Sequence, residues 1–198
     1  MAKTPFIIVG LGNPGSEYDQ TRHNAGFWFL HRLVGAPGFR RQKKLLAQTA
    51  TWSLNGDDVL LCKPDTYMNH SGQCVRAVLD WYKLAAADCA HKLLIVHDEL
   101  DLPPGVARLK LGGGHGGHNG LRSIQQHLGT NQWLRLRIGV GHPGMAEQVT
   151  AWLIHQRMPA ADRDQLESAF EQAAAVLPQL LAGDLALAMN RLHSSASP

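Results

Sequence analysis

Side chains that could act together as a general base occur where predicted strands end. His23 follows the strand-like run Phe6–Leu11 after a short loop, and Asp98 directly follows the run Lys92–His97. Because open α/β sheets bind ligands at the carboxyl ends of their strands, we expect His23 and Asp98 to lie close together. A carboxylate that accepts a hydrogen bond from one imidazole nitrogen fixes the tautomer and raises the basicity of the other. The pair therefore predicts a histidine that removes a proton from water.

Amide side chains occur at the same predicted edge. Asn13 and Asn24 accompany the first strand, Asn69 follows the third, and Asn119 closes a glycine-rich loop. A primary amide both donates and accepts, so it can hold a carbonyl group and a water molecule without adding charge. Each residue also has a simpler interpretation, since Asn69 alone could cap a helix, and Asp98 alone could belong to a turn.

The sequence lacks other familiar catalytic motifs. A GxSxG nucleophile motif is absent. Residues 10–15 match the dinucleotide pattern GxGxxG, but Pro14 removes an amide, and residues 30–39 hold no acid to bind a ribose. His115 and His118 could join His23 on zinc, yet no cysteine or carboxylate has the matching spacing. We therefore expect no cofactor and no metal, and a reaction in which water attacks with help from a histidine base.

The composition is that of an ordinary globular protein. The 198 residues are 44% hydrophobic and 18% charged, which excludes collagen-like, disordered and coiled-coil classes. No apolar run approaches the roughly 20 residues of a membrane span, and no signal peptide is evident, so we expect a cytoplasmic protein. The three cysteines form no CxxC pair and are expected to pack in the core.

Charge is distributed unevenly along the chain. Residues 1–144 carry 16 Lys and Arg against 10 Asp and Glu, whereas residues 145–198 carry 3 against 6. This asymmetry permits a polyanionic ligand on the first part of the chain. The cluster Arg40, Arg41, Lys43 and Lys44 could contribute to it or could simply be a solvated face.

The hydrophobic patterns predict a single three-layer α/β/α domain over residues 1–193, with a mixed, mostly parallel sheet and a frayed tail at 194–198. Strands are predicted at Phe6–Leu11, Leu46–Leu54, Asp57–Lys63, Lys92–His97 and Trp133–Val140. Helices are predicted at Asn24–Val34, Gly72–Lys83, Asn119–Leu128 and Asp162–Leu181. The stretch Gly105–Gly144 holds 11 of the 20 glycines, which indicates a special backbone geometry or the close approach of a ligand.

Taken together, these segments resemble the bacterial-type peptidyl-tRNA hydrolases over nearly the whole chain. The resemblance rests on residues 9–15 with 18 and 21–26, 63–64 with 67–72, 97–101, the glycine loop through 122, 135–143 and 190–192. It implies hydrolysis of the ester between a peptide, or an N-acylated amino acid, and the terminal ribose of tRNA. It also implies a cytoplasmic monomer that acts in translation and ribosome rescue, without metal or cofactor.

The resemblance also implies a role for each matching residue. His23 matches the general base and Asp98 the carboxylate that orients it, while Asn69 and Asn119 match amides that bind the acyl-ribose end and position water. Asn13 matches the residue that separates N-blocked from free aminoacyl-tRNA. Further substrate contacts are implied for Tyr18, Tyr67, Met68 and His118, and tRNA phosphate contacts for Arg108, Lys110 and Arg137.

Two other classes of protein remain as alternatives. A non-catalytic RNA-binding protein on this scaffold would tolerate the loss of His23 or Asp98, and both are present. A metal-dependent esterase would be inactivated by a chelator. The sequence leaves open whether residues 145–160 act as a mobile lid.

Overall fold

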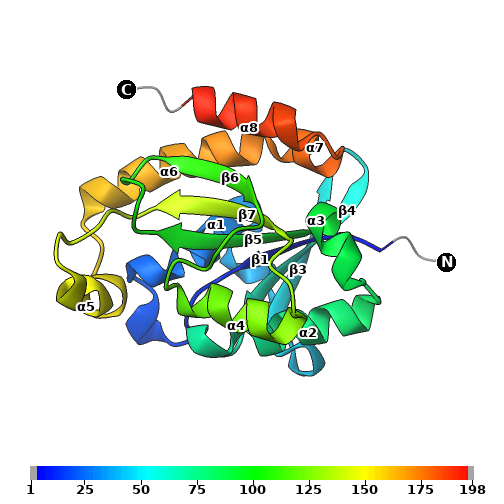
Figure 1. Cartoon of the computed structure of the whole chain (residues 1–198), viewed down its shortest axis with the longest axis horizontal. Coiled ribbons are helices and arrows are strands. Elements are labelled where there is room, and N and C mark those ends of the chain that lie inside the picture. The colour runs from blue at the N-terminus through cyan, green and yellow to red at the C-terminus, as the bar shows by residue number, and fades with distance from the viewer. Residues whose placement is uncertain (1–3, 196–198) are drawn as a thin grey trace.

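A seven-stranded mixed sheet runs through the centre of the computed structural model, which describes residues 4–195 (Figure 1). The strand order is β2-β3-β4-β1-β5-β7-β6. The pairs β4·β1, β1·β5 and β5·β7 are parallel, whereas the pairs nearer the two edges are antiparallel. The strands are β1 (Phe6–Gly10), β2 (Arg40–Gln42), β3 (Ala47–Leu54), β4 (Asp57–Pro64), β5 (Leu93–Glu99), β6 (Ala107–Leu111) and β7 (Leu134–Gly139).

Helices cover the two faces of the sheet and one of its ends. In Figure 1, α6, α7 and α8 lie above the sheet and α2 and α4 lie below it, while α5 lies at the left end. The α-helices are α1 (Ala25–Val34), α2 (Ser71–Tyr82), α3 (Cys89–Lys92), α4 (Asn119–Leu128), α5 (Val149–Ile154), α6 (Ala160–Ala175), α7 (Leu177–Leu181) and α8 (Leu185–Ser194). The predicted α/β fold with a mixed sheet is confirmed, but the sheet is not mostly parallel, because β2·β3, β3·β4 and β6·β7 are antiparallel.

The core has two parts because side chains alternate across each strand. Ile8 of β1 packs with α1, α6 and α8 residues on one face, whereas Ile7 and Val9 pack with α2 and α4 residues on the other. All five residues of β1 are buried, as expected for a central parallel strand covered on both sides. The centre of the sheet is therefore a rigid base for the loops at its carboxyl edge.

All five predicted strands exist with shifts of one or two residues at their ends, but β2 and β6 were not predicted. Both are short edge strands in which charged side chains obscure the hydrophobic alternation. The helix predicted at Asp162–Leu181 is wrong in extent: α6 ends at Ala175 and α7 begins at Leu177. Pro178 lacks the N–H group that would continue the helix. Helices α3, α5 and α8 were also not predicted.

The tail predicted at 194–198 is wrong at its first residue, because Ser194 ends helix α8. Ser195 follows that helix, and 196–198 lie outside the described residues. Cys62, Cys74 and Cys89 are free and buried, as predicted. Among residues 4–195, no helix combines the length and apolar character needed to cross a membrane.

Two glycines bring β1 and α1 into backbone contact. A Cβ atom on Gly10 would collide with the carbonyl group of Gly26, and one on Gly26 would collide with the backbone of Leu11 and with the Val96 carbonyl oxygen. The glycines of this region therefore allow a helix to pack directly on the central strands. This contact sets the position of the segment between β1 and α1, which carries His23.

Candidate active site

A cavity of about 660 Å³ lies at the carboxyl edge of the parallel strands. Its wall combines segments that follow β1, β4 and β5 with the glycine loop after β6 and the helix α5. This is the edge where the sequence predicted a site. Of the predicted site residues, it is lined by Asn13, Tyr18, His23, Tyr67, Met68, Asn69, Asp98, Lys110, His118, Asn119 and Arg137.

The predicted contact between His23 and Asp98 is present. His23 lies in the 3₁₀ segment η2 (Arg22–Asn24), and its Nδ1 is 2.8 Å from Oδ2 of Asp98 on β5. Both side chains are buried. Because the carboxylate accepts, the proton must reside on Nδ1, which leaves a lone pair on Nε2. No group of the described residues 4–195 hydrogen-bonds to that Nε2, so it is available to a molecule in the cavity.

The second oxygen of Asp98 accepts from another imidazole. His118 Nε2 lies 2.9 Å from Asp98 Oδ1, and His118 Nδ1 accepts from the backbone amides of Gly120 and Leu121 at the start of α4. Burial alone would raise the pKa of Asp98, but the adjacent imidazoles of His23 and His118 outweigh it and hold the pKa well below its ordinary value. Asp98 is therefore an anion that orients two rings.

The predicted contact of His118 with a substrate stays a prediction, and the structure shows a further role for this ring within the protein. Both of its ring nitrogens already hydrogen-bond within the protein, so the ring can touch a substrate only through its carbon atoms and faces. His118 instead links Asp98 to the first turn of α4, where Asn119 is the first residue. Nothing in the sequence pattern indicated this capping contact.

A third histidine and a buried arginine lie behind this network, and neither was predicted as a site residue. His97 Nδ1 donates to the carbonyl oxygen of Asp98 at 2.8 Å, and His97 Nε2 accepts from Arg135 Nε at 3.3 Å. Burial, with the neighbouring His118 and Arg135, holds the pKa of His97 well below its ordinary value, so the ring is neutral. The sequence signal that could have identified His97 and Arg135 is their alternation with apolar residues on β5 and β7. Residues at such positions more often pack in the core than bind a ligand.

Donor atoms of His23, Asp98 and His118 lie within 4.8 Å of one another, a spacing that could hold a metal ion. However, the two imidazole nitrogens in that set donate hydrogen bonds to Asp98, so a metal would have to displace both protons. His115, considered as a ligand from sequence, uses its Nδ1 to accept from the amide of Gly117. The donor chemistry therefore favours a hydrogen-bonded network over a metal centre.

Asn13 is held by two neighbours in a fixed orientation. Its backbone amide donates to Asn24 Oδ1 at 2.8 Å, and Asn24 Nδ2 donates to the Asn13 carbonyl oxygen at 3.0 Å. The side-chain Oδ1 of Asn13 accepts from the amide of Met68 at 2.7 Å. Because the oxygen is used in this way, the Asn13 Nδ2 group is the one left to donate into the cavity.

The remaining predicted residues form an exposed rim. Tyr18 and Tyr67 make an edge-to-face pair with ring centroids 6.3 Å apart, and Tyr67 is 55% exposed. Asn69 lies in the 3₁₀ segment η5 (Met68–His70) and does not cap α2 with its side chain. Asn119 Oδ1 has one long contact, 3.4 Å from Arg122 Nη1. These side chains can reorient toward a bound molecule.

Basic side chains line one side of the cavity on β6 and β7. The register pairs Arg108 with Arg137 and Lys110 with Arg135, so all four lie on the same face of the sheet. Arg137 Nε is 3.0 Å from Glu99 Oε2. Arg108 does not line the cavity but lies beside it on the edge strand, where a large polyanion could reach it.

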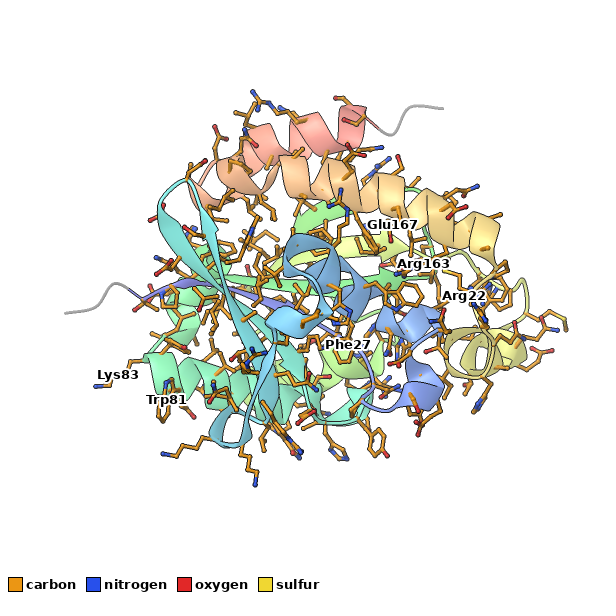
Figure 2. All side chains as sticks on the ribbon, turned by 180° about the vertical axis from the view of Figure 1, so that it is seen from behind. Arg22, Phe27, Trp81, Lys83, Arg163 and Glu167 are labelled. Atoms are coloured by element: carbon orange, nitrogen blue, oxygen red, sulfur yellow. The ribbon has the colours of Figure 1, made fainter. Side chains whose placement is uncertain are left out.

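The other basic cluster, Arg40, Arg41, Lys43 and Lys44, does not line the cavity. Arg41 pairs with Asp65 at 2.6 Å, and Lys44 lies 5.5 Å from the ring centroid of Trp81. Figure 2 shows Trp81 and Lys83 at the opposite end of the molecule from α5, which forms part of the cavity wall. The cluster is therefore not part of this site.

Helix α5 was missed by the sequence analysis although four of its residues line the cavity: Val149, Thr150, Leu153 and Ile154. The guanidinium of Arg22 stacks 3.4 Å from the centroid of Trp152 and donates to the Trp152 carbonyl oxygen at 3.2 Å. Figure 2 shows Arg22 beside α5. Because Arg22 precedes His23, this stacking contact connects helix α5 to the segment that carries His23.

Comparison with known proteins places these features in context. A family model described as peptidyl-tRNA hydrolase matches residues 7–198. A peptidyl-tRNA hydrolase of Pseudomonas putida is 51% identical over 191 residues, 95% of this chain and 96% of the relative. One from Marinobacter nauticus is 47% identical over 196 residues, 98% and 97% of the two chains. The crystal structure of peptidyl-tRNA hydrolase from Acinetobacter baumannii has a TM-score of 0.86 at 44% identity, covering 96% of this chain and 94% of that chain.

Proposed function

The chain belongs to the peptidyl-tRNA hydrolase family, and from this premise we propose that it hydrolyses the ester bond between a peptide and the terminal ribose of tRNA. The same reaction would release an N-acylated amino acid from its tRNA. The observation that carries the mechanism is the 2.8 Å hydrogen bond between His23 and Asp98, which leaves His23 Nε2 free in the cavity. His23 is the general base and Asp98 fixes its tautomer.

The proposed reaction proceeds by attack of water on the ester carbonyl carbon. His23 Nε2 takes a proton from the water as its oxygen bonds to carbon, and the anionic Asp98 stabilises the imidazolium that forms. The bond between the carbonyl carbon and the ribose oxygen then breaks, and the imidazolium returns the proton to that oxygen. The products are a free ribose hydroxyl and a peptide carboxylic acid, which releases the second proton of the water to solvent and becomes a carboxylate.

Amide groups around the cavity stabilise the oxyanion that develops on the carbonyl oxygen. Asn69 and Asn119 bind the acyl-ribose end and position water at the rim. The base and a donor that is fixed before the substrate binds each contribute on the order of 10²–10³-fold. A rim amide, which the substrate must first order, contributes less. Because an ester has a good leaving group compared with an amide, these contributions suffice without a covalent intermediate.

Discrimination against free aminoacyl-tRNA is assigned to Asn13. A blocked amine is a neutral amide, and its carbonyl oxygen can accept from Asn13 Nδ2, the group left free by the contacts of Oδ1. A free ammonium would lose hydration in the cavity and would meet an N–H donor instead of a counter-charge. Tyr18, Tyr67 and Met68 complete the substrate contacts.

Binding of the tRNA itself is assigned to Arg108, Lys110 and Arg137. They lie on one face of β6 and β7 beside the cavity. Contacts of this kind to phosphates give affinity that does not depend on sequence and falls with salt.

One assay separates the proposed function from the alternatives of a metal-dependent esterase and a non-catalytic RNA-binding protein. N-acetylated and free aminoacyl-tRNA are incubated with the enzyme in the presence of excess chelator, and release of the amino acid is measured. We expect hydrolysis of the acetylated substrate only. Inhibition by the chelator would support a metal enzyme, and binding without hydrolysis of either substrate would support the binding protein.

The assembly and location of the protein are part of the same proposal. A single copy contributes every residue assigned above, so a monomer is sufficient for the reaction. We propose a monomeric cytoplasmic enzyme that acts in translation. Sedimentation at the assay concentration tests the monomer, and cell fractionation tests the location.

A further inference from the structure

Arg135 is a buried cation in the wall of the cavity that the proposed mechanism does not use. It is the second residue of β7, its exposed fraction is 4%, and it lines the cavity from the β6 and β7 side. Burial lowers the pKa of its guanidinium, but an arginine side chain stays charged in proteins. A buried positive charge requires acceptors, so the partners of each N–H group must be identified.

Three of the five N–H groups of Arg135 have partners. Nε donates to His97 Nε2 at 3.3 Å, and Nη1 donates to the carbonyl oxygens of Gly112 at 3.3 Å and Gly114 at 2.9 Å. Asn131 Nδ2 donates to the Gly113 carbonyl oxygen at 3.2 Å, so the three successive carbonyl groups of the loop all accept from fixed side chains. Arg135 thus holds the start of the loop that ends at His118 and Asn119.

The second terminal nitrogen, Nη2, has no such partner. Within residues 4–195, no acceptor lies in hydrogen-bond range of Nη2, yet Nη2 is not among the buried polar atoms that lack a partner. It therefore reaches accessible space, and the space that Arg135 borders is the cavity. Two N–H donors of a buried cation are left for a ligand.

The surroundings of Arg135 favour an anion. Lys110 lies opposite Arg135 in the register of β6 and β7, and Arg137 projects from the same face. Of the nearby carboxylates that line the cavity, Glu99 is paired with Arg137, and Asp101 is exposed at the rim. The anionic Asp98 is already engaged by His23 and His118. This side of the cavity is consequently positive, and the terminal nitrogen Nη2 of Arg135 has N–H donors left for an anion.

The position of Arg135 relative to the base suggests which anion. The ring centroids of His23 and His118 are 4.9 Å apart, those of His118 and His97 are 5.1 Å apart, and Arg135 Nε contacts His97. His118 and His97 therefore lie between Arg135 and His23, whose Nε2 takes the proton from the attacking water. In the substrate, the phosphate nearest to the ester is the one attached to the 5′ oxygen of the same ribose.

We propose that Arg135 binds the phosphodiester on the 5′ side of the terminal nucleoside, so that one guanidinium fixes both the glycine loop and the leaving nucleoside. This inference rests on the proposed function and names a phosphate subsite inside the cavity. It is separate from the contacts assigned to Arg108, Lys110 and Arg137, which lie closer to solvent or to Glu99. A carboxylate, such as that of the released peptide, has the same hydrogen-bonding chemistry and must be distinguished by experiment.

The test combines a change in the substrate with a change in the enzyme. The substrates are N-acetyl-aminoacyl esters of a short oligonucleotide ending in CCA, with either natural linkages or one neutral methylphosphonate at the terminal linkage or at the linkage before it. The enzymes are wild type, Arg135→Lys, Arg135→Gln and, as the matched control on the neighbouring strand, Arg108→Ala. The Tm of each variant is measured first, and kcat and KM are then determined.

We expect the neutral terminal linkage to raise KM of the wild-type enzyme by about 10- to 100-fold, the range for one charge-assisted hydrogen-bonded contact. The linkage before it should cost less than the terminal one. In Arg135→Gln the natural substrate should already show the higher KM, and the neutral terminal linkage should add less than twofold. In Arg135→Lys the neutral terminal linkage should raise KM by part of the wild-type factor, and in Arg108→Ala it should raise KM by the full wild-type factor.

Several outcomes would overturn the subsite. The first is that the neutral terminal linkage does not raise KM of the wild-type enzyme. The second is that it raises KM equally in wild type and Arg135→Gln, and the third is that it no longer raises KM in Arg108→Ala. The wild-type arm decides even if the Arg135 variants fail to fold. If instead Arg135 binds the product carboxylate, inhibition by N-acetyl-amino acid will weaken in Arg135→Lys while the linkage penalty is unchanged. Failure of wild type to cleave the natural ester would count against the proposed function itself.

Discussion

The inner wall and the rim of the cavity differ in how their polar side chains are satisfied. On the inner wall, His23, Asp98 and Asn13 are buried and held by hydrogen bonds of 2.7 to 2.8 Å that fix their orientation. At the rim, Asn69 and Asn119 are exposed and have few contacts. Side chains that are fixed before the substrate binds lose little conformational entropy on binding, whereas the rim side chains must be ordered by the substrate. Substitutions in the inner wall should therefore reduce kcat most, and those at the rim should have smaller effects.

The strongest way to break this comparison is to remove the base. His23→Ala should lower kcat by about 10²–10⁴-fold, because no other imidazole nitrogen in the described cavity is free to accept a proton. Binding of tRNA should persist, since the basic residues of β6 and β7 are untouched. Single-turnover hydrolysis and filter binding measure the two effects, and retention of more than a few per cent of the rate would refute the assignment of the base.

The orientation of the base is tested by Asp98→Asn, which preserves shape. The amide can donate to His23 Nδ1 and so favour the tautomer in which Nε2 carries the proton. We expect kcat to fall by about 10²–10³-fold with KM changed only a few-fold. Asn69→Asp, which alters a carboxamide at the rim, serves as the comparison. An equal loss of kcat in both variants would show that the fixed inner wall has no special role.

Salt should weaken the contacts of the basic residues with tRNA phosphates and should leave the buried catalytic groups unchanged. For three phosphate contacts, raising salt from about 50 to 200 mM should raise KM by roughly 20- to 40-fold while kcat changes little. The measurement is steady-state hydrolysis of N-acetyl-aminoacyl-tRNA at several salt concentrations. A KM that does not respond to salt would remove Arg108, Lys110 and Arg137 as phosphate contacts.

A rim substitution should have a more modest effect. Asn119→Ala removes an amide that has only one long contact in the structure. We expect kcat/KM to fall about 10-fold, the value of one net hydrogen bond. A loss of 10³-fold would mean that Asn119 is already ordered in the working enzyme, and the distinction between the rim and the inner wall would fail.

The smallest expected effect comes from a histidine that does not line this cavity. His31 accepts from Lys63 Nζ at 2.7 Å, and burial, with Lys63 and Arg163 nearby, lowers the pKa of His31 to about 4. The unfolded chain binds a proton near pH 6.5 and the folded chain does not, so stability falls as pH decreases from 6.5 to 4. Because His31 is half-buried, His31→Gln should flatten this decline by only about 1 kcal/mol.

Urea unfolding at pH 7, 5.5 and 4.5 measures that change, with kcat at pH 7.5 as the control. An unaltered pH dependence would contradict the assignment to His31. A loss of kcat at pH 7.5 would show that His31 influences the catalytic residues, although it does not line their cavity.

The sequence allowed prediction of the parts of the site that follow from strand direction. Because the carboxyl ends of parallel strands share one edge, Asn13, His23 and Asp98 could be placed together before any contact was known. The pairing of His118 with Asp98 could not be predicted, since it depends on how the glycine loop folds back over β5. Arg135 was missed although it alternates with Arg137 on β7, because the sequence does not show that the Arg135 side chain is buried in the cavity wall.

The same contrast applies to the fold. The central strands were predicted because short apolar runs bounded by turn residues are typical of buried strands. In contrast, β6 alternates Arg108 and Lys110 with buried residues over only five positions and runs directly into the glycine-rich loop, so it was not predicted. Helix α5 is six residues long, too short for a clear helical period, although it supplies part of the cavity wall. Residues 10–15 lead from β1 into the 3₁₀ segment η1 (Ser16–Tyr18), and α1 begins only at Ala25, so they do not open a helix as a dinucleotide motif does.

That glycine pair makes the reaction depend on two residues that carry no functional group. A single methyl group at Gly10 or Gly26 would push the first helix off the sheet and shift the histidine that precedes it away from its carboxylate. A displacement of about 1 Å at such a site can cost on the order of 100-fold in rate. A mutational survey restricted to ionisable and amide side chains would therefore overlook two of the most sensitive positions in the enzyme.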